Sequence, residues 1–110
     1  MMTMGKHDLR VSRHGDKRAR QRAGLPRKAV ERMAGVALSK GIGYGEAYGS
    51  LKGYLGWLYA RYDGSGNNIR IYGDKVWVFH DGTLITMLNV PGEQRKAARD
   101  QQRKRRSKDW

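Results

Sequence analysis

The chain contains no cysteine. This absence excludes a disulfide-stabilised scaffold and a thiolate metal site. Long hydrophobic runs are also missing, since no apolar stretch approaches the roughly 20 residues that a membrane-spanning helix needs. The first ten residues, MMTMGKHDLR, lack the apolar core of a signal peptide. We therefore expect a cytoplasmic protein that has no membrane partner and no cofactor.

Acidic residues are scarce, with ten Asp and Glu against 23 Lys and Arg and a formal net charge of +13. The excess lies at the two ends. Residues 1–32 hold ten basic and three acidic residues, residues 33–92 hold five and four, and residues 93–110 hold eight and three. This clustering indicates a polyanionic partner, most simply nucleic acid or a ribonucleoprotein. A solubilising tail or an acidic protein partner would explain the same charges.

Three short runs rich in β-branched and aromatic residues follow one another in the second half of the chain. They are residues 69–72, 75–80 and 83–90. The dipeptides Gly73-Asp74 and Asp81-Gly82 separate them and are typical of two-residue hairpin turns. The pattern predicts a three-stranded antiparallel meander at the centre of a single α+β domain over residues 12–91.

The two turns set a register, and the alternation of side chains then assigns each strand residue to one face. This register pairs Val78 with Ile85 and Trp77 with Thr86. One face is uniformly apolar and is expected to lie under helices: Ile69, Ile71, Val76, Val78, Ile85 and Met87. The other face is expected to be open and carries Arg70, Tyr72, Lys75, Trp77, Phe79, Leu84, Thr86 and Leu88.

A basic helix is predicted near the N-terminus, where Ser12 can cap its start and Gly24 its end. His14, Arg18 and Arg22 recur at i, i+4 and i+8 and therefore form one stripe. The stripe has two interpretations. It either grips phosphate or takes part in catalysis, or it is the solvated side of a helix on which the histidine is incidental.

Two amphipathic helices are predicted to follow, from Pro26 to Gly41 and over residues 50–62. Val30, Met33, Ala37 and Leu38 form the apolar stripe of the first helix. That of the second is Leu51, Tyr54, Leu55, Leu58, Tyr59 and Tyr62. The glycine-rich residues 41–49 are interpreted as a flexible connection. Residues 1–11 are expected to be flexible, and residues 92–110 to be a basic tail or frayed helix without an apolar face.

The order of these elements resembles the small RelE-like fold of bacterial toxins, within the barnase/RelE group of metal-independent ribonucleases. The resemblance spans about residues 13–91 and includes the LITMLNVP strand at residues 84–91. It implies N-terminal helices packed on one face of a three- to four-stranded antiparallel sheet. The helix at 50–62 departs from the usual plan, and a fourth strand is not obvious unless residues 42–48 provide it.

RNA cleavage without metal needs a base, an acid and cations that stabilise the phosphorane. By the resemblance, His14, Arg70 and Thr86 are the expected catalytic residues, and His80 is a second candidate for proton transfer. Trp77 would stack on a base. The expected nucleic-acid contacts are Arg18, Arg22, Tyr72, Lys75, Trp77, Arg95, Arg99, Arg103, Arg105 and Arg106. Alternatively, the row of Arg70, Trp77 and Thr86 only stabilises the sheet.

The expected partner is nucleic acid, RNA before DNA, with the ribosome and an acidic antitoxin or other acidic protein as further candidates. No metal site is visible, because the three histidines lie far apart in the sequence. Whether the protein cleaves RNA stays open at this point. The alternative is a non-catalytic binder of nucleic acid or nucleoprotein, for example a phage or mobile-element inhibitor.

Overall fold

A computed structural model describes residues 9–108, with side chains as far as Arg105. The elements in chain order are β1 (Arg10–Val11), α2 (Arg13–Ala23), α3 (Arg27–Lys40), α4 (Gly49–Tyr62), β2 (Asn68–Tyr72), β3 (Lys75–His80), β4 (Thr83–Asn89) and α5 (Gly92–Lys108). The predicted α+β class and the meander of β2, β3 and β4 are confirmed. Within the described residues, no helix has the length and apolar character needed to cross a membrane.

The sheet has four strands in the order β1-β4-β3-β2, and it is mixed rather than purely antiparallel. Its fourth strand is β1, which runs parallel to β4 and pairs Arg10 with Thr83. Flexibility was expected over residues 1–11. Residues 1–8 lie outside the described part, and residues 10 and 11 form β1, a strand that the sequence did not indicate. Residues 42–48 add only one bridge, between Ile42 and Ile71.

The predicted register holds for the whole of the first hairpin and only for the start of the second. His80 pairs with Thr83 and Phe79 with Leu84, as predicted, but a β-bulge then shifts the pairing. Val78 pairs with Thr86 instead of Ile85, and Trp77 pairs with Met87 instead of Thr86. A bulge inserts one extra residue on one strand, which a strict alternation pattern cannot reveal. Met87 therefore moves to the face of Trp77.

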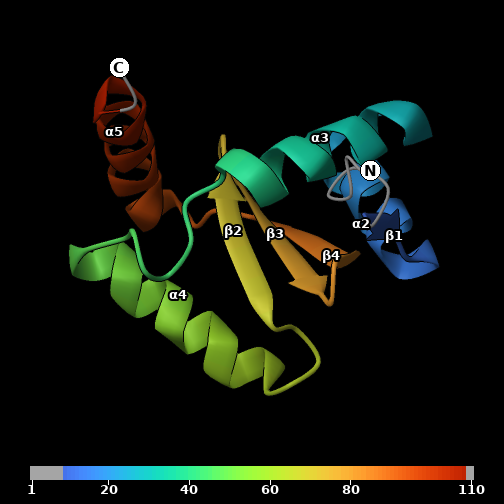
Figure 1. Ribbon diagram of the computed structural model, residues 1–110, viewed down its shortest axis with the longest axis horizontal. Coiled ribbons are helices and arrows are strands. Elements are labelled where there is room, and N and C mark those ends of the chain that lie inside the picture. Colours follow the sequence, from blue (N-terminus) through green and yellow to red (C-terminus); the bar gives the residue numbers. More distant parts are fainter. Residues whose placement is uncertain (1–8, 109–110) are drawn as a thin grey trace, which may run out of the picture.

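Both faces of the sheet are covered (Figure 1), so the prediction of one open face is wrong. Helices α2 and α3 pack on the face that carries Trp77, Phe79, Leu84 and Met87. Helix α4 and the start of α5 pack on the opposite face, against Ile69, Ile71, Val76 and Val78. Trp77 is consequently only 1% exposed.

Helix α2 lies very close to β4 because of one glycine. Ser12 caps the helix by accepting a hydrogen bond from the amide of Gly15, and Gly24 ends it in the left-handed conformation at φ 66°. A Cβ atom on Gly15 would overlap the carbonyl oxygen of Leu84. The predicted caps are confirmed, and the glycine between them allows contact between backbones.

The expected basic C-terminal tail or frayed helix is a folded helix that packs against the domain. Ala98 is buried in the core beside α4. The Gln101 side chain accepts from the Tyr48 amide (3.1 Å) and donates to the Tyr48 carbonyl (3.0 Å). Gln102 makes the same pair of bonds with Gly73, both at 2.8 Å. The prediction missed this docking because small and amide side chains replace the usual apolar stripe.

Candidate nucleic-acid interface

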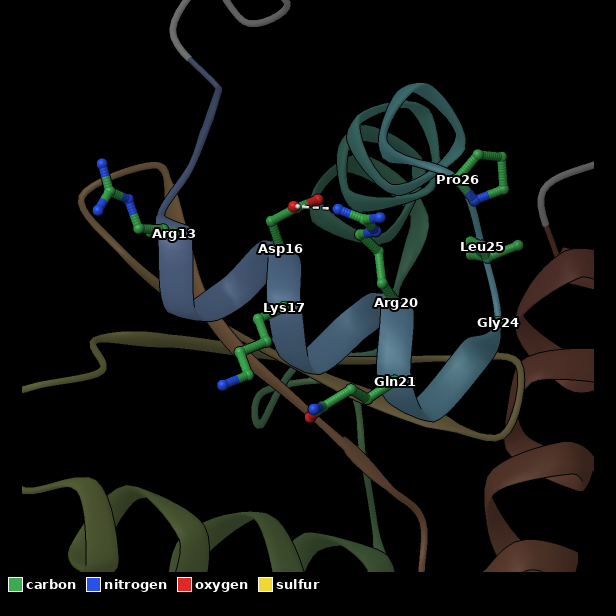
Figure 2. Close-up of a pocket in the computed structure, with 8 residues that line it drawn as sticks. All are labelled: Arg13, Asp16, Lys17, Arg20, Gln21, Gly24, Leu25 and Pro26. Carbon is green, nitrogen blue, oxygen red and sulfur yellow. Dashed lines mark hydrogen bonds and ion pairs between the residues drawn. The ribbon is translucent and has the colours of Figure 1, made fainter.

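The solvent side of α2 carries three cations along one stripe, Arg13, Lys17 and Arg20. They line a shallow hollow between α2 and the start of α3 (Figure 2), together with Asp16, Gln21, Gly24, Leu25 and Pro26. Asp16 is the only carboxylate among these residues and pairs with Arg20 at 3.4 Å. The hollow therefore has a net positive charge and is open to a polyanion.

Only part of the predicted stripe of His14, Arg18 and Arg22 is available to contact a ligand. His14 is exposed and accepts a hydrogen bond from Arg18 Nε at 3.4 Å. Arg22 instead donates from Nη1 to the carbonyl oxygen of Met87 at 2.7 Å. This bond ties the helix to β4, so Arg22 has a structural role that the sequence did not indicate.

The three residues expected to catalyse RNA cleavage do not come together. His14 is on α2, and Arg70 is on β2, two strands away from β4 in the sheet. Thr86 is 6% exposed and is paired with Val78, on the face opposite α2. No hydrogen bond or ion pair between side chains of the described residues joins any two of them.

Of the remaining residues predicted on the open sheet face, Tyr72, Trp77, Phe79 and Leu84 lie under α2 and α3, and Leu88 packs on the α4–α5 side. Trp77 is buried and donates from Nε1 to the Tyr72 carbonyl at 3.4 Å, so its predicted stacking on a base is wrong. Tyr72 is half-buried at the edge of the same core. Lys75 pairs with Asp74 at 3.5 Å, and His80 lies beside Asp81 at 3.3 Å in the turn.

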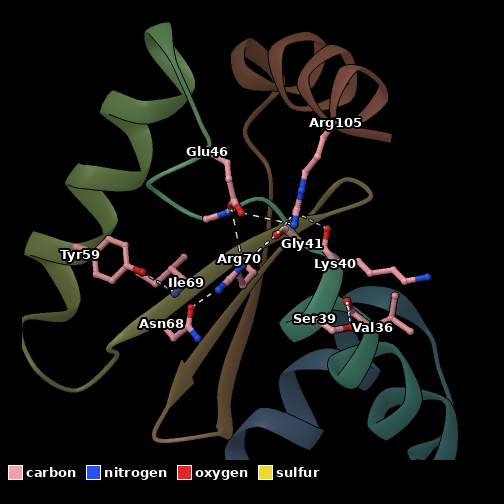
Figure 3. Close-up of polar contacts among 11 residues, drawn as sticks. Val36, Ser39, Lys40, Gly41, Glu46, Tyr59, Asn68, Ile69, Arg70 and Arg105 are labelled. Atoms are coloured by element: carbon pink, nitrogen blue, oxygen red, sulfur yellow. Dashed lines mark hydrogen bonds and ion pairs between the residues drawn. The ribbon is translucent and has the colours of Figure 1, made fainter. Parts of the chain in front are cut away.

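Arg70 belongs to a polar cluster where α3, β2 and α5 meet (Figure 3). Glu46 lies between Arg70 (3.9 Å) and Arg105 (3.5 Å) and accepts from the Gly43 amide at 2.7 Å. Arg105 also donates to the carbonyl oxygens of Lys40 (2.8 Å) and Gly41 (2.7 Å). Cations at these carbonyls are favourable, because a helix C-terminus carries partial negative charge.

Helix α5 displays most of its cations to solvent. Arg99, Arg103 and Lys104 are exposed, as are Arg95 and Lys96. Arg95 Nε also donates to the Val90 carbonyl at 3.3 Å, and Arg103 pairs with Asp100. Arg106 belongs to the helix, but its side chain lies outside the described part. Among the predicted contacts of α5 whose side chains are described, Arg105 is the one that is only partly exposed, and it binds Lys40, Gly41 and Glu46.

Asp100 is the acidic residue in the middle of this row of cations. Lys96 donates a hydrogen bond to it at 2.9 Å, and this bond lowers the pKa of the Asp100 carboxyl, with Arg103 and Arg99 adding to the effect. The carboxylate is thus neutralised locally by its neighbours. Among residues 9–105, no three His, Cys, Asp or Glu side chains group together as metal ligands would.

Three exposed aromatic side chains were missed as candidates. Tyr44 is 45% exposed, Tyr48 47% and Trp57 56%. Trp57 lies off the predicted apolar stripe of α4, and this position was the available signal. Each of the three rings has a cation near it: Lys52, Lys104 and Arg61 respectively.

Comparisons of the chain with protein-family models, with curated proteins and with solved structures found no match. The RelE-like architecture therefore stays a prediction. The candidate interface depends on the geometry and charge of this chain alone.

Proposed function

We propose that the protein binds nucleic acid through the exposed cations of α2, α3 and α5 and does not cleave it. One observation carries the proposal. Arg105 of the C-terminal basic helix donates to the carbonyls of Lys40 and Gly41, at the C-terminal end of α3 and more than half of the sequence away. The C-terminal basic helix thus lies at the end of α3, and the charges of both ends contribute to adjoining helices.

The cations on these helices exceed what their carboxylates neutralise. The exposed set comprises Arg13, Lys17, Arg20, Arg27, Lys28, Arg32, Lys40, Arg95, Lys96, Arg99, Arg103 and Lys104. Asp16, Glu31 and Asp100 each pair with members of this set. The remaining cations would bind the phosphates of a nucleic acid and release the counterions around them, so binding is favoured at low salt.

We do not propose RNA cleavage, because the residues expected to catalyse it lie apart. Thr86 and Trp77 are buried, and Arg70 is held by Gly41, Asn68 and Glu46. A general base must reach the proton that it removes, within about 3 Å or through one water. His14 is on α2, and neither Arg70 nor Thr86 lies beside it to complete such a site.

The test is fluorescence anisotropy of labelled RNA and of the same sequence as DNA, titrated with the full-length protein at increasing NaCl. We expect affinity to fall steeply with salt. In the triple variant Arg13→Gln/Lys17→Gln/Lys28→Gln, the slope of log K against log salt should fall by about 2 to 3. The charge-conserving control, Arg13→Lys/Lys17→Arg/Lys28→Arg, should keep the parent slope.

Two results would contradict the proposal. If the parent binds neither polymer at low salt, nucleic-acid binding is wrong. If the parent cleaves RNA in the presence of EDTA and His14→Ala abolishes the cleavage, the non-catalytic part is wrong and the ribonuclease alternative is supported.

A further inference from the structure

Large aromatic rings that the core does not use are exposed on α4 and on the loop that precedes it. Leu51, Leu55 and Leu58 form the buried side of the helix. Tyr44, Tyr48 and Trp57 are about half exposed, and we call these three rings the α4 aromatic surface. They are the large hydrophobic side chains exposed in the described structure. Tyrosine and tryptophan are enriched at interfaces, because each combines a large apolar ring with a polar group.

Two of the rings, those of Tyr44 and Trp57, pack against neighbouring aromatic side chains. Tyr44 makes an edge-to-face contact with Tyr59, with centroids 6.3 Å apart at 88°. A Cβ atom on Gly56 would contact the Tyr44 ring at 3.4 Å, so the ring lies directly over the α4 backbone. Trp57 stacks with Tyr54 at 6.3 Å and 18°. This ordering reduces the entropy lost when a partner binds.

Each ring also has a cation beside it. Lys52 Nζ lies 4.7 Å from the centre of Tyr44, and Arg61 Cζ lies 5.6 Å from that of Trp57. Lys104 of α5 lies 5.6 Å from Tyr48. Helix α4 contains no acidic residue. The carboxylate of Glu46, in the preceding loop, is already held by Arg70 and Arg105.

We propose that the α4 aromatic surface stacks the bases of a single-stranded nucleic acid, an inference that rests on the proposed nucleic-acid binding. Aromatic rings alternating with cations suit a strand whose bases and phosphates are both accessible. A duplex hides the faces of its bases. A second copy of this chain would bring two surfaces of the same positive charge together, which disfavours association between copies.

One of the three rings, Tyr48, also contacts the basic helix α5. The Gln101 side chain binds both backbone groups of Tyr48, and Lys104 reaches the Tyr48 ring. A strand whose phosphates contact α5 can therefore place its next bases on Tyr48 and on α4. The cations would provide most of the salt dependence, and the rings the preference for single strands.

The test uses the full-length protein and a fluorescein-labelled RNA of about 20 nucleotides, single-stranded or annealed to its complement. Trp57→Ala and Tyr44→Ala should each weaken single-strand binding by about 10-fold, while duplex affinity and the salt slope stay unchanged. Trp57→Phe retains an aromatic ring and should stay within about twofold of the parent. Both alanine variants should fold normally, because the rings lie outside the core.

The outcomes separate this inference from the proposed function. If both alanine variants bind the single strand as the parent does, or lose single-strand and duplex binding equally, the stacking surface is wrong while binding by the basic helices stands. If the parent sediments as a dimer that Trp57→Ala dissociates, the surface joins two copies, and the inference is overturned. If the parent binds no nucleic acid, both proposals fail.

Discussion

On the two faces of the central sheet, the largest side chains of the core come from different elements. On the α2–α3 side the sheet provides the large residues, Trp77, Phe79 and Met87, and the helices provide mainly alanines, Ala19, Ala34 and Ala37. On the α4–α5 side the sheet provides Ile69, Ile71, Val76 and Val78, and α4 provides Leu51, Leu55 and Leu58. Each face is filled, but the volume comes from different elements.

This difference decides how each helix is held. Small residues let α2 approach the sheet until backbone meets backbone, at Gly15 against Leu84 and through the bond from Arg22 to Met87. The leucine side chains of α4 instead separate this helix from the sheet, and their packing positions it. Its outer side then remains free for Tyr44 and Trp57. We therefore expect substitutions on the two sides of the sheet to change the stability of the protein by different amounts.

The largest effect is expected for Trp77→Ala on the α2–α3 side. The alanines of the helices cannot fill the space of the lost ring, so unfolding free energy should fall by ~3–5 kcal/mol. Urea denaturation followed by circular dichroism would measure it. A loss below ~1 kcal/mol would restore the open sheet face that alternation alone predicts.

Leu55→Ala probes the opposite face and should cost about 3 kcal/mol, because it leaves a cavity among buried residues. The same denaturation experiment applies. Leu55→Met keeps most of the volume and is the matched control, with an expected loss under about 1.5 kcal/mol. If alanine and methionine behave alike, α4 does not depend on its leucines for position.

Gly15→Ala tests the close approach of α2 to β4. The added methyl group would overlap the Leu84 carbonyl, so the helix must shift at a cost of about 2 kcal/mol. Thermal unfolding measures the change. A variant as stable as the parent would show that α2 can move away from the sheet without loss.

Gly53→Ala is the counterpart on α4 and should have the opposite sign. Nothing lies within 4 Å of a Cβ atom there, and the residue is exposed. Alanine is the better helix former, so stability should rise by about 0.5–1 kcal/mol. A decrease in the thermal midpoint would mean that the outer side of α4 is covered in solution.

The smallest effect concerns Asp100 in α5. Its pKa is lowered by Lys96, so its contribution to stability is present above the unfolded-state pKa and is lost as pH falls through the folded-state pKa. Asp100→Asn should therefore be slightly less stable than the parent at pH 7. The difference should vanish at low pH, once the carboxyl of the parent is protonated. If Asp100→Asn differed in stability from the parent by the same amount at pH 7 and at low pH, this linkage would be contradicted.

The candidate interface was only partly predictable. The excess of cations at both ends follows directly from composition, and α5 displays most of the arginines expected there. Which cations of α2 face solvent depends on how the helix rotates against β4. Arg22 turned inward to Met87, while Arg13 and Lys17 turned outward. Likewise, pattern alone could not decide that Trp77 is buried, because helices cover both faces of the sheet.

The sequence by itself determined the local features. Two-residue turns set the β2–β3 register, and Asp81 and Gly82 both take the positive φ that their turn requires. Ser12 and Gly24 delimit α2, and leucine spacing defines the buried side of α4. These features depend on residues within a few positions of one another, where conformational preference and periodicity act directly.

Only the tertiary structure decided the rest. The bulge before Thr86, the parallel pairing of β1 with β4, the covering of both faces and the docking of α5 through Gln101 and Gln102 all join distant segments. Such contacts depend on the volume and hydrogen-bonding groups that other elements present. The positions of the charges came from the sequence, but the tertiary structure buried Trp77 and brought Arg105 of α5 to the end of α3.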